Sequence, residues 1–112
     1  LDDDKDWGVQ FFTGRDVYQT GLSAAINAVP EGANVILAID VDGIDPTVVP
    51  GVILPAFGGL TYQDMLELIH GVAARANIVG ADFVEFVPEQ DPTGRGAQAI
   101  ARLVSNVIAA SQ

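Results

Sequence analysis

Residues 35–46 read VILAIDVDGIDP, and this stretch decides the fold. Its first five residues, Val35 to Ile39, are continuously apolar, which is typical of a parallel strand covered on both faces. Asp40 and Asp42 follow directly, and Asp45 precedes a proline. In parallel α/β sheets, ligands bind beyond the carboxyl ends of the strands. The stretch therefore predicts a buried strand that ends in a pair of carboxylates at a ligand-binding edge.

Strand-like and helix-like segments alternate on both sides of this stretch. Apolar runs of strand length occupy residues 9–12, 35–39 and 78–87, with a break in the last run. Helical spacing of apolar residues covers 15–28 (interrupted by Gly21), 61–76 and the segment after Gly94. Thr61 and Asp64 form a variant of a helix-starting capping box. This alternation predicts an α/β fold with a parallel sheet.

The composition excludes several partners. The chain has 112 residues, with 5 Lys and Arg against 15 Asp and Glu, and a net charge of −10. Nucleic acid and anionic membranes are excluded as partners because both require a basic surface. The sequence holds no cysteine, no signal peptide and no apolar run near the roughly 20 residues of a membrane span. We therefore expect a cytoplasmic protein.

The polar surface is small for a free-standing domain. Hydrophobic residues make up 49% and charged residues 18%, where about 25% charged is usual. A small domain needs more polar covering because its surface is large relative to its volume. We infer that residues 7–112 belong to a larger domain or an assembly. Residues 1–6, with four Asp and one Lys, are interpreted as a linker or cloning remnant.

The two carboxylates at the end of the strand are the candidate metal ligands. Residues i and i+2 of an extended backbone point to the same side, so Asp40 and Asp42 would repel each other unless a cation lies between them. Oxygen ligands suit Mn²⁺ or Mg²⁺ better than Zn²⁺. The alternative is that these residues only cap turns. We assign that structural role to Asp45, which we expect to fix the following loop by bonding backbone amides.

Three blocks of sequence resemble the ureohydrolases, the family of arginase and agmatinase. The blocks are Asp40-Val41-Asp42-Gly43-Ile44-Asp45-Pro46 with Pro50-Gly51, then Pro55-x-x-Gly58-Gly59-Leu60-Thr61, then Gly80-Ala81-Asp82-Phe83-Val84-Glu85. They cover roughly residues 35–110 in the family's order and spacing. The resemblance implies a three-layer α/β/α fold, of which this chain is the C-terminal part. It also implies hydrolysis of a guanidino compound to urea and an amine at a di-manganese centre.

The resemblance assigns roles to individual residues. Asp40 is expected to bridge both Mn²⁺ ions, Asp42 to chelate one of them, and Glu85 to bind the substrate guanidinium. An ion pair with Arg95 is the alternative for Glu85. The family also implies a trimer or hexamer for the intact enzyme. No catalytic residue is assigned beyond the metal ligands.

The chain departs from the family in ways that matter. A Gly-Gly-Asp-His block and an Asp-Ala-His-x-Asp block are absent, and the single histidine, His70, is interpreted as a helix surface or packing residue. Two carboxylates cannot hold two metal ions tightly, so we predict that the chain alone is inactive. Apolar residues at 52–54, where arginases tend to carry Thr and Gly, favour an agmatinase-like enzyme over an arginase.

Other function classes stay open at this point. Arginase or another guanidino-acid hydrolase is the nearest alternative. A haloacid-dehalogenase-type phosphatase would use Asp40 as nucleophile and Asp42 as acid–base group with Mg²⁺. That family wants Thr where Ile44 stands and a lysine downstream, whereas the one lysine here is Lys5. The third alternative is a non-catalytic, oligomerising α/β fragment.

Overall fold

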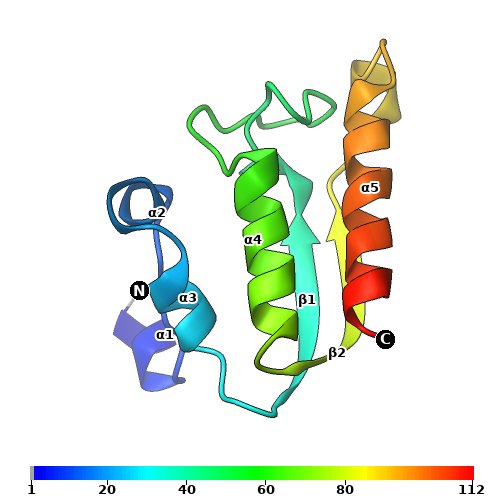
Figure 1. Cartoon of the computed structure of the whole chain (residues 1–112). Helices are drawn as coiled ribbons and strands as arrows, with labels where there is room; N and C mark the ends of the chain where they lie inside the picture. The colour runs from blue at the N-terminus through cyan, green and yellow to red at the C-terminus, as the bar shows by residue number, and fades with distance from the viewer. Residues whose placement is uncertain (1) are drawn as a thin grey trace.

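The computed structural model describes residues 2–112. Two strands and five α-helices, with two short 3-10 turns, follow one another along the chain (Figure 1). In order they are α1 (Asp2–Asp6), α2 (Gly14–Thr20), α3 (Ser23–Asn27), β1 (Asn34–Asp40), η1 (Val41–Gly43), α4 (Tyr62–Ala73), β2 (Asn77–Val84), η2 (Pro88–Gln90) and α5 (Arg95–Ala110).

The two strands are parallel and end at the same edge. β1 pairs with β2 from Asn34 opposite Asn77 to Asp40 opposite Val84. The register shifts once, so that Val79 is an extra residue on β2. A parallel pair needs a crossover connection, and α4 supplies it. The predicted parallel α/β architecture is confirmed, and Asp40 lies across from the residue that precedes Glu85.

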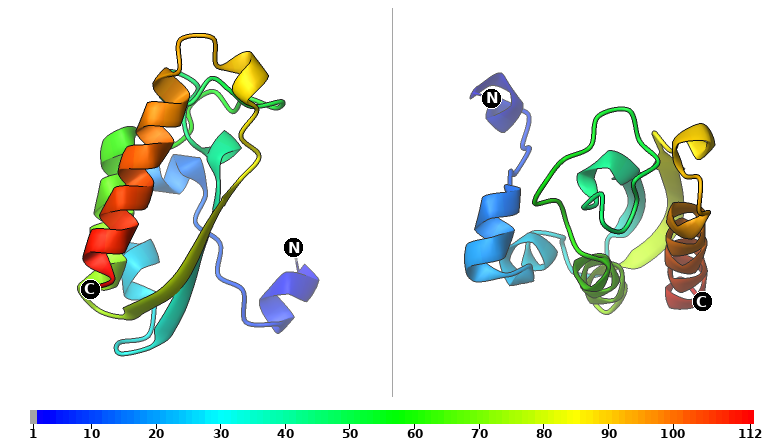
Figure 2. Two further views of the ribbon diagram at one scale, coloured as in Figure 1. Left: turned by 90° about the vertical axis from the view of Figure 1, so that its right-hand side faces the viewer. Right: turned by 90° about the horizontal axis from the view of Figure 1, so that it is seen from above.

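Helices α4 and α5 cover one face of this sheet (Figure 2). The start of α4 is fixed as predicted: the Thr61 hydroxyl accepts from the Asp64 amide at 3.0 Å, and the Asp64 carboxylate accepts from the Thr61 amide at 2.9 Å. The helices bury apolar residues at three- and four-residue spacing against the strands, as an amphipathic stripe does. The core consists of Val41, Ile44, Val49, Val52, Met65, Ile69, Val72, Ala76, Ile78, Leu103 and Val107.

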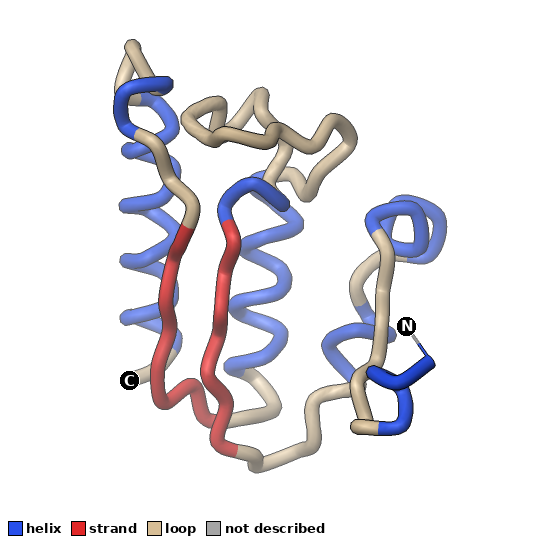
Figure 3. The backbone as a smooth tube through the Cα atoms, turned by 180° about the vertical axis from the view of Figure 1, so that it is seen from behind, coloured by secondary structure: helices blue, strands red, loops and turns tan. Residues whose placement is uncertain are grey.

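The opposite face of the sheet is bare within the described part of the chain. Seen from behind, no helix lies across the strands (Figure 3). Ile36 is 69% exposed and Val79 62% exposed. The expectation that the strand is covered on both faces is therefore wrong for residues 2–112 by themselves. The continuous apolar run is nevertheless what a sheet between two helix layers requires, and residues 2–112 hold two parallel strands and one helix layer.

The N-terminal segment differs most from the sequence expectation. Residues 9–12 form an exposed connection and not a strand, because the described residues place no strand beside them. The expected helix over 15–28 is divided at Gly21, which has φ +80°, into α2 and α3. These helices lie beside the sheet (Figure 1). No helix among residues 2–112 combines the length and apolar character needed to cross a membrane.

Candidate metal centre at the carboxyl end of the sheet

Asp40 and Asp42 lie together, but for a different reason than the sequence suggested. Asp40 is the last residue of β1, and Asp42 lies in the 3-10 turn η1 instead of on extended backbone. The Asp42 amide donates to Oδ1 of Asp40 at 3.2 Å. The intervening Val41 is fully buried, which anchors the turn in the core. The expected alternation along an extended backbone is therefore wrong, and a tight turn at the strand end brings the carboxyl groups together.

The electrostatics of this edge are those of crowded acids. A hydrogen bond with the Asp40 carboxyl group, then burial, then the charges of Asp40 and Glu85 raise the pKa of Asp42 above its ordinary value of 3.8. All the charged neighbours that shift this pKa are acids. The negative charges of Asp40 and Glu85 thus both disfavour the ionised form of Asp42. Repulsion of this kind is relieved when a cation binds between the groups.

Glu85 occupies an unusual backbone conformation immediately after β2. It is the one non-glycine residue with positive φ that the described part of the chain contains, at +71°. Such a conformation is uncommon for a residue with a Cβ and typically marks a functional or strongly constrained position. Among residues 2–112 no ion pair joins Glu85 to Arg95, so the structure does not support that alternative.

The long loop after η1 is fastened to the strand end. Asp45 accepts hydrogen bonds from the Thr47 amide at 2.9 Å, the Thr47 hydroxyl at 2.7 Å and the Gly58 amide at 3.0 Å. The Thr47 hydroxyl first, and these backbone amides with it, lower the pKa of Asp45 below 3.8. Asp45 therefore has the structural role predicted for it. Backbone bonds from Leu60 to Gly43 and from Asp45 to Leu60, at 3.0 and 2.9 Å, close the loop.

The middle of the same loop exposes large apolar side chains. Ile53 is 66% exposed, Leu54 73% and Phe57 90%, whereas Val52 is buried. Seen from above, the loop curves around the end of β1 (Figure 2). An apolar segment thus lies at the edge of the sheet where the carboxylates gather.

His70 takes no part in this cluster. It lies exposed on α4, and its Nε2 is 2.8 Å from Oδ1 of Asn106 on α5. The Asn106 amide group donates to the Arg102 carbonyl oxygen at 2.8 Å, which leaves Oδ1 as the acceptor for the His70 N–H. The structure confirms His70 as a helix-packing residue. Among the described residues, no three His, Cys, Asp or Glu side chains are arranged to hold a metal ion.

One buried acid escaped the sequence analysis. Asp91 is 7% exposed and accepts from the Gly96 and Ala97 amides at the start of α5, at 3.0 and 2.9 Å. An acidic residue shortly before an apolar helical pattern is a helix-start signal, so its position before Pro92-Thr93-Gly94 could have identified it.

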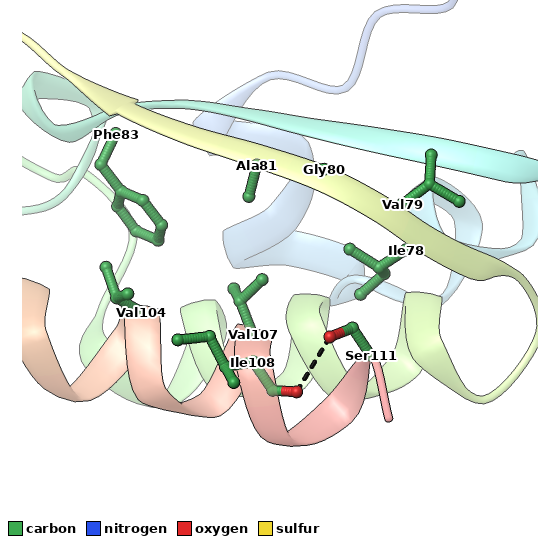
Figure 4. Close-up of a pocket in the computed structure, with 9 residues that line it drawn as sticks. All are labelled: Ile78, Val79, Gly80, Ala81, Phe83, Val104, Val107, Ile108 and Ser111. Atoms are coloured by element: carbon green, nitrogen blue, oxygen red, sulfur yellow. Dashed lines mark hydrogen bonds between the residues drawn. The ribbon is translucent and has the colours of Figure 1, made fainter.

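An apolar groove of the surface lies away from the acids at the strand ends. A groove of about 270 Å³ runs between β2 and α5. Figure 4 shows Phe83 and Ile78 pointing from β2 toward α5, and the Ser111 hydroxyl donating to the Ile108 carbonyl oxygen at 2.9 Å. No ionisable side chain is among the residues that line it. Its lining consists of Ile78, Val79, Gly80, Ala81, Phe83, Val104, Val107, Ile108 and Ser111.

Known proteins resemble this chain along nearly its whole length. A family model described as "Arginase family" matches residues 1–110. The chain belongs to the arginase family. Arginase 1, mitochondrial, of Arabidopsis thaliana is 42% identical over 76 residues, covering 67% of this chain and 22% of that protein. The agmatinase of Blochmanniella floridana is 36% identical over 91 residues, covering 79% of this chain and 30% of that protein.

Solved structures of the arginase family share this fold. The agmatine ureohydrolase of Thermoplasma volcanium superposes with a TM-score of 0.80 at 34% identity, covering 92% of this chain and 34% of that one. The chain thus spans about a third or less of these relatives. Family membership decides against the phosphatase alternative. It assigns no role to single residues, so Asp40 and Asp42 as metal ligands and Glu85 as substrate ligand stay predictions.

Proposed function

We propose that this chain supplies part of the active site of a manganese-dependent, agmatinase-like ureohydrolase. The whole protein would hydrolyse agmatine or a similar guanidino compound to urea and an amine, in the cytoplasm and as a trimer or hexamer. Arginase-family membership supports the reaction class. The observation that carries the assignment of the site is the convergence of Asp40, Asp42 and Glu85 at one edge of the parallel sheet.

The acids at the strand ends fit a divalent cation in their chemistry. Carboxylate oxygens suit Mn²⁺ and Mg²⁺. A hydrogen bond with Asp40 and, after burial, the charges of Asp40 and Glu85 raise the pKa of Asp42, and a cation would offset those charges. Asp40 and Asp42 would hold the metal. Bound there, it would lower the pKa of a water molecule enough to supply hydroxide at neutral pH. Two carboxylates are an incomplete ligand set, so the remaining ligands would come from outside these 112 residues.

Glu85 would hold the substrate in place. A guanidinium group is planar and always charged, and a carboxylate can accept two of its N–H bonds side by side. Glu85 follows Val84, which pairs with Asp40, so a guanidinium bound to it would lie at the same edge as the metal ligands. This arrangement would present the guanidino carbon to the nucleophile.

A chimeric enzyme tests the proposal. Residues 7–112 would replace the matching C-terminal part of the Thermoplasma volcanium agmatine ureohydrolase, and urea release from agmatine would be measured with Mn²⁺ added. We expect activity in the chimera, its loss in Asp40→Asn, and its retention in Glu31→Gln. Glu31 is an exposed acid before β1, at the opposite end of the sheet, so it controls for the removal of one charge.

The same assay separates the alternatives. A folded chimera that releases no urea would contradict the proposal and favour a non-catalytic fragment, for which the bare sheet face provides an association surface. Preference for arginine or guanidinobutyrate over agmatine would favour another guanidino hydrolase. The 112-residue chain by itself is expected to release no urea, since it lacks part of the ligand set.

A further inference from the structure

We propose that Asp91 is a positioning residue that holds Glu85 in its left-handed conformation. The functional meaning of that position rests on the role proposed above for Glu85. The physical link between the two residues does not, because it follows from contacts within the chain. Asp91 is the buried acid among the side chains that the structure describes, at 7% exposed, and it lies outside the carboxylate cluster.

Both carboxylate oxygens of Asp91 are engaged by the start of α5. Oδ1 accepts from the Gly96 amide at 3.0 Å and Oδ2 from the Ala97 amide at 2.9 Å. A buried carboxylate is tolerated when such donors replace water, and a negative charge is favoured at the positive end of a helix. The side chain is therefore fixed at both oxygens.

Two glycines form a slot around Asp91. A Cβ on Gly51 would lie 2.9 Å from Cβ of Asp91 and 2.8 Å from the Phe86 ring. A Cβ on Gly96 would lie 3.0 Å from Oδ1 of Asp91. Gly51 comes from the loop after β1 and Gly96 from α5, so Asp91 joins segments that are far apart in the sequence. The packing leaves no room for a side chain at either glycine.

Two contacts connect this slot to the residues that follow Glu85. The Gly51 carbonyl oxygen accepts from the Val87 amide at 2.7 Å, and the Phe86 ring packs on the same glycine. On its other side, Glu85 follows Val84, which is paired with β1. Glu85 therefore lies between two fixed residues, Val84 in β2 and Val87 bonded to Gly51. The backbone turns between them at Glu85, which has φ +71°. A strained conformation persists only where its surroundings determine it. Asp91 packs against Gly51 and so helps to fix the position of Val87.

The experiment compares the wild-type chain with Asp91→Asn and Asp91→Ala by NMR, without metal or substrate. The readouts are the three-bond amide–Hα coupling and the Cα chemical shift of Glu85, which report φ, and amide exchange at Val87. We expect both Glu85 readouts to leave their left-handed values and Val87 exchange to accelerate about tenfold relative to α4 amides, the scale of a lost helix cap. Asp91→Asn keeps the side-chain volume and one acceptor, so it remains informative if Asp91→Ala does not fold.

Two further variants distinguish positioning from general destabilisation. Thr61→Ala removes the cap of α4, and we expect it to lower stability while the Glu85 readouts stay unchanged. Gly51→Ala places a Cβ against Asp91 and Phe86, and we expect it to change the Glu85 readouts as the Asp91 variants do. If Glu85 keeps its left-handed φ in Asp91→Asn, Asp91 does not position Glu85 and the proposal is overturned. A folded chimera that releases no urea would contradict the proposed function, but it would not change what the NMR comparison shows about Asp91 and Glu85.

Discussion

Gly59→Ala tests how the loop after β1 is closed. A Cβ at Gly59 would lie 2.7 Å from the Asp45 nitrogen, 2.7 Å from the Gly43 oxygen and 2.9 Å from the Ile44 carbonyl carbon. All three are backbone atoms of the segment that follows Asp42. A flexible side chain could rotate away from such a contact, but here the backbone itself must move.

The expected destabilisation is about 3 kcal/mol. Overpacking of a tight site costs about 1–3 kcal/mol. The clash also separates the partners of the Leu60–Gly43 and Asp45–Leu60 backbone bonds, each contributing about 1 kcal/mol. The added alanine also lowers the conformational entropy of the unfolded chain, which offsets about 0.4–1 kcal/mol of this loss. A loss near 3 kcal/mol is large for a domain whose total stability is of the order of 5–15 kcal/mol.

Urea unfolding followed by far-UV circular dichroism measures this change. The midpoint should fall by about 2 M if the slope is about 1.5 kcal/mol per M. Trp7 is 88% exposed, so its fluorescence would not report the core. Gly43→Ala is the matched control: its Cβ would meet nothing within 4 Å, and we expect a change within about 0.5 kcal/mol. Equal stability of Gly59→Ala and wild type would refute the reasoning.

Three further variants probe the acids, each by the same urea titration. Glu85→Gly should raise stability by about 0.5–1 kcal/mol, because relief of a left-handed residue (about 1–2 kcal/mol) exceeds the added entropy of glycine, and it should abolish urea release by the chimera. Asp42→Asn should be more stable than wild type at pH 7 and equal to it well below pH 3.8. The reason is that a group with a raised pKa in the folded state stabilises the wild type at low pH, and this stability is lost as the group ionises. Asp45→Asn should be less stable than wild type at pH 7, since the pKa of Asp45 is lowered in the folded chain. This loss of stability should shrink as pH falls below 3.8. A loss that does not change with pH would contradict the role of the Asp45 charge.

Local signals explain why β1 and α4 were predictable. The apolar run 35–39 is short and rich in β-branched residues, which favours a strand. Thr61 with Asp64 fixes a helix start by hydrogen bonds between residues three apart. The parallel pairing followed from the helix between the strands. The position of Asp45 in its loop was predictable for the same reason, because an aspartate before proline bonds nearby amides.

Contacts between distant segments explain what the sequence analysis missed. Residues 9–12 have a strand-like composition, but strand formation needs a partner strand, and the described chain places none beside them. The buried position of Asp91 depends on Gly51, forty residues earlier in the printed sequence. The conformation of Glu85 depends on the same contact. A helix-start signal near Asp91 indicates a capping acid, but nothing within a few residues of either acid indicates the contact with Gly51.

The strand-end site combines features that each oppose folding. Asp42 is held against Asp40 at the expense of charge repulsion, and Glu85 occupies a strained conformation. The Asp40 carboxylate stabilises the chain by capping η1. Asn at position 42 and Gly at position 85 are expected to give a more stable chain, so stability does not explain the acids at those two positions. The surrounding structure, by contrast, is built to hold them: buried Val41 anchors the turn, Asp45 fastens the loop, and Asp91 fixes the segment after Glu85. Rigid support of this kind is what the cation site proposed above would require.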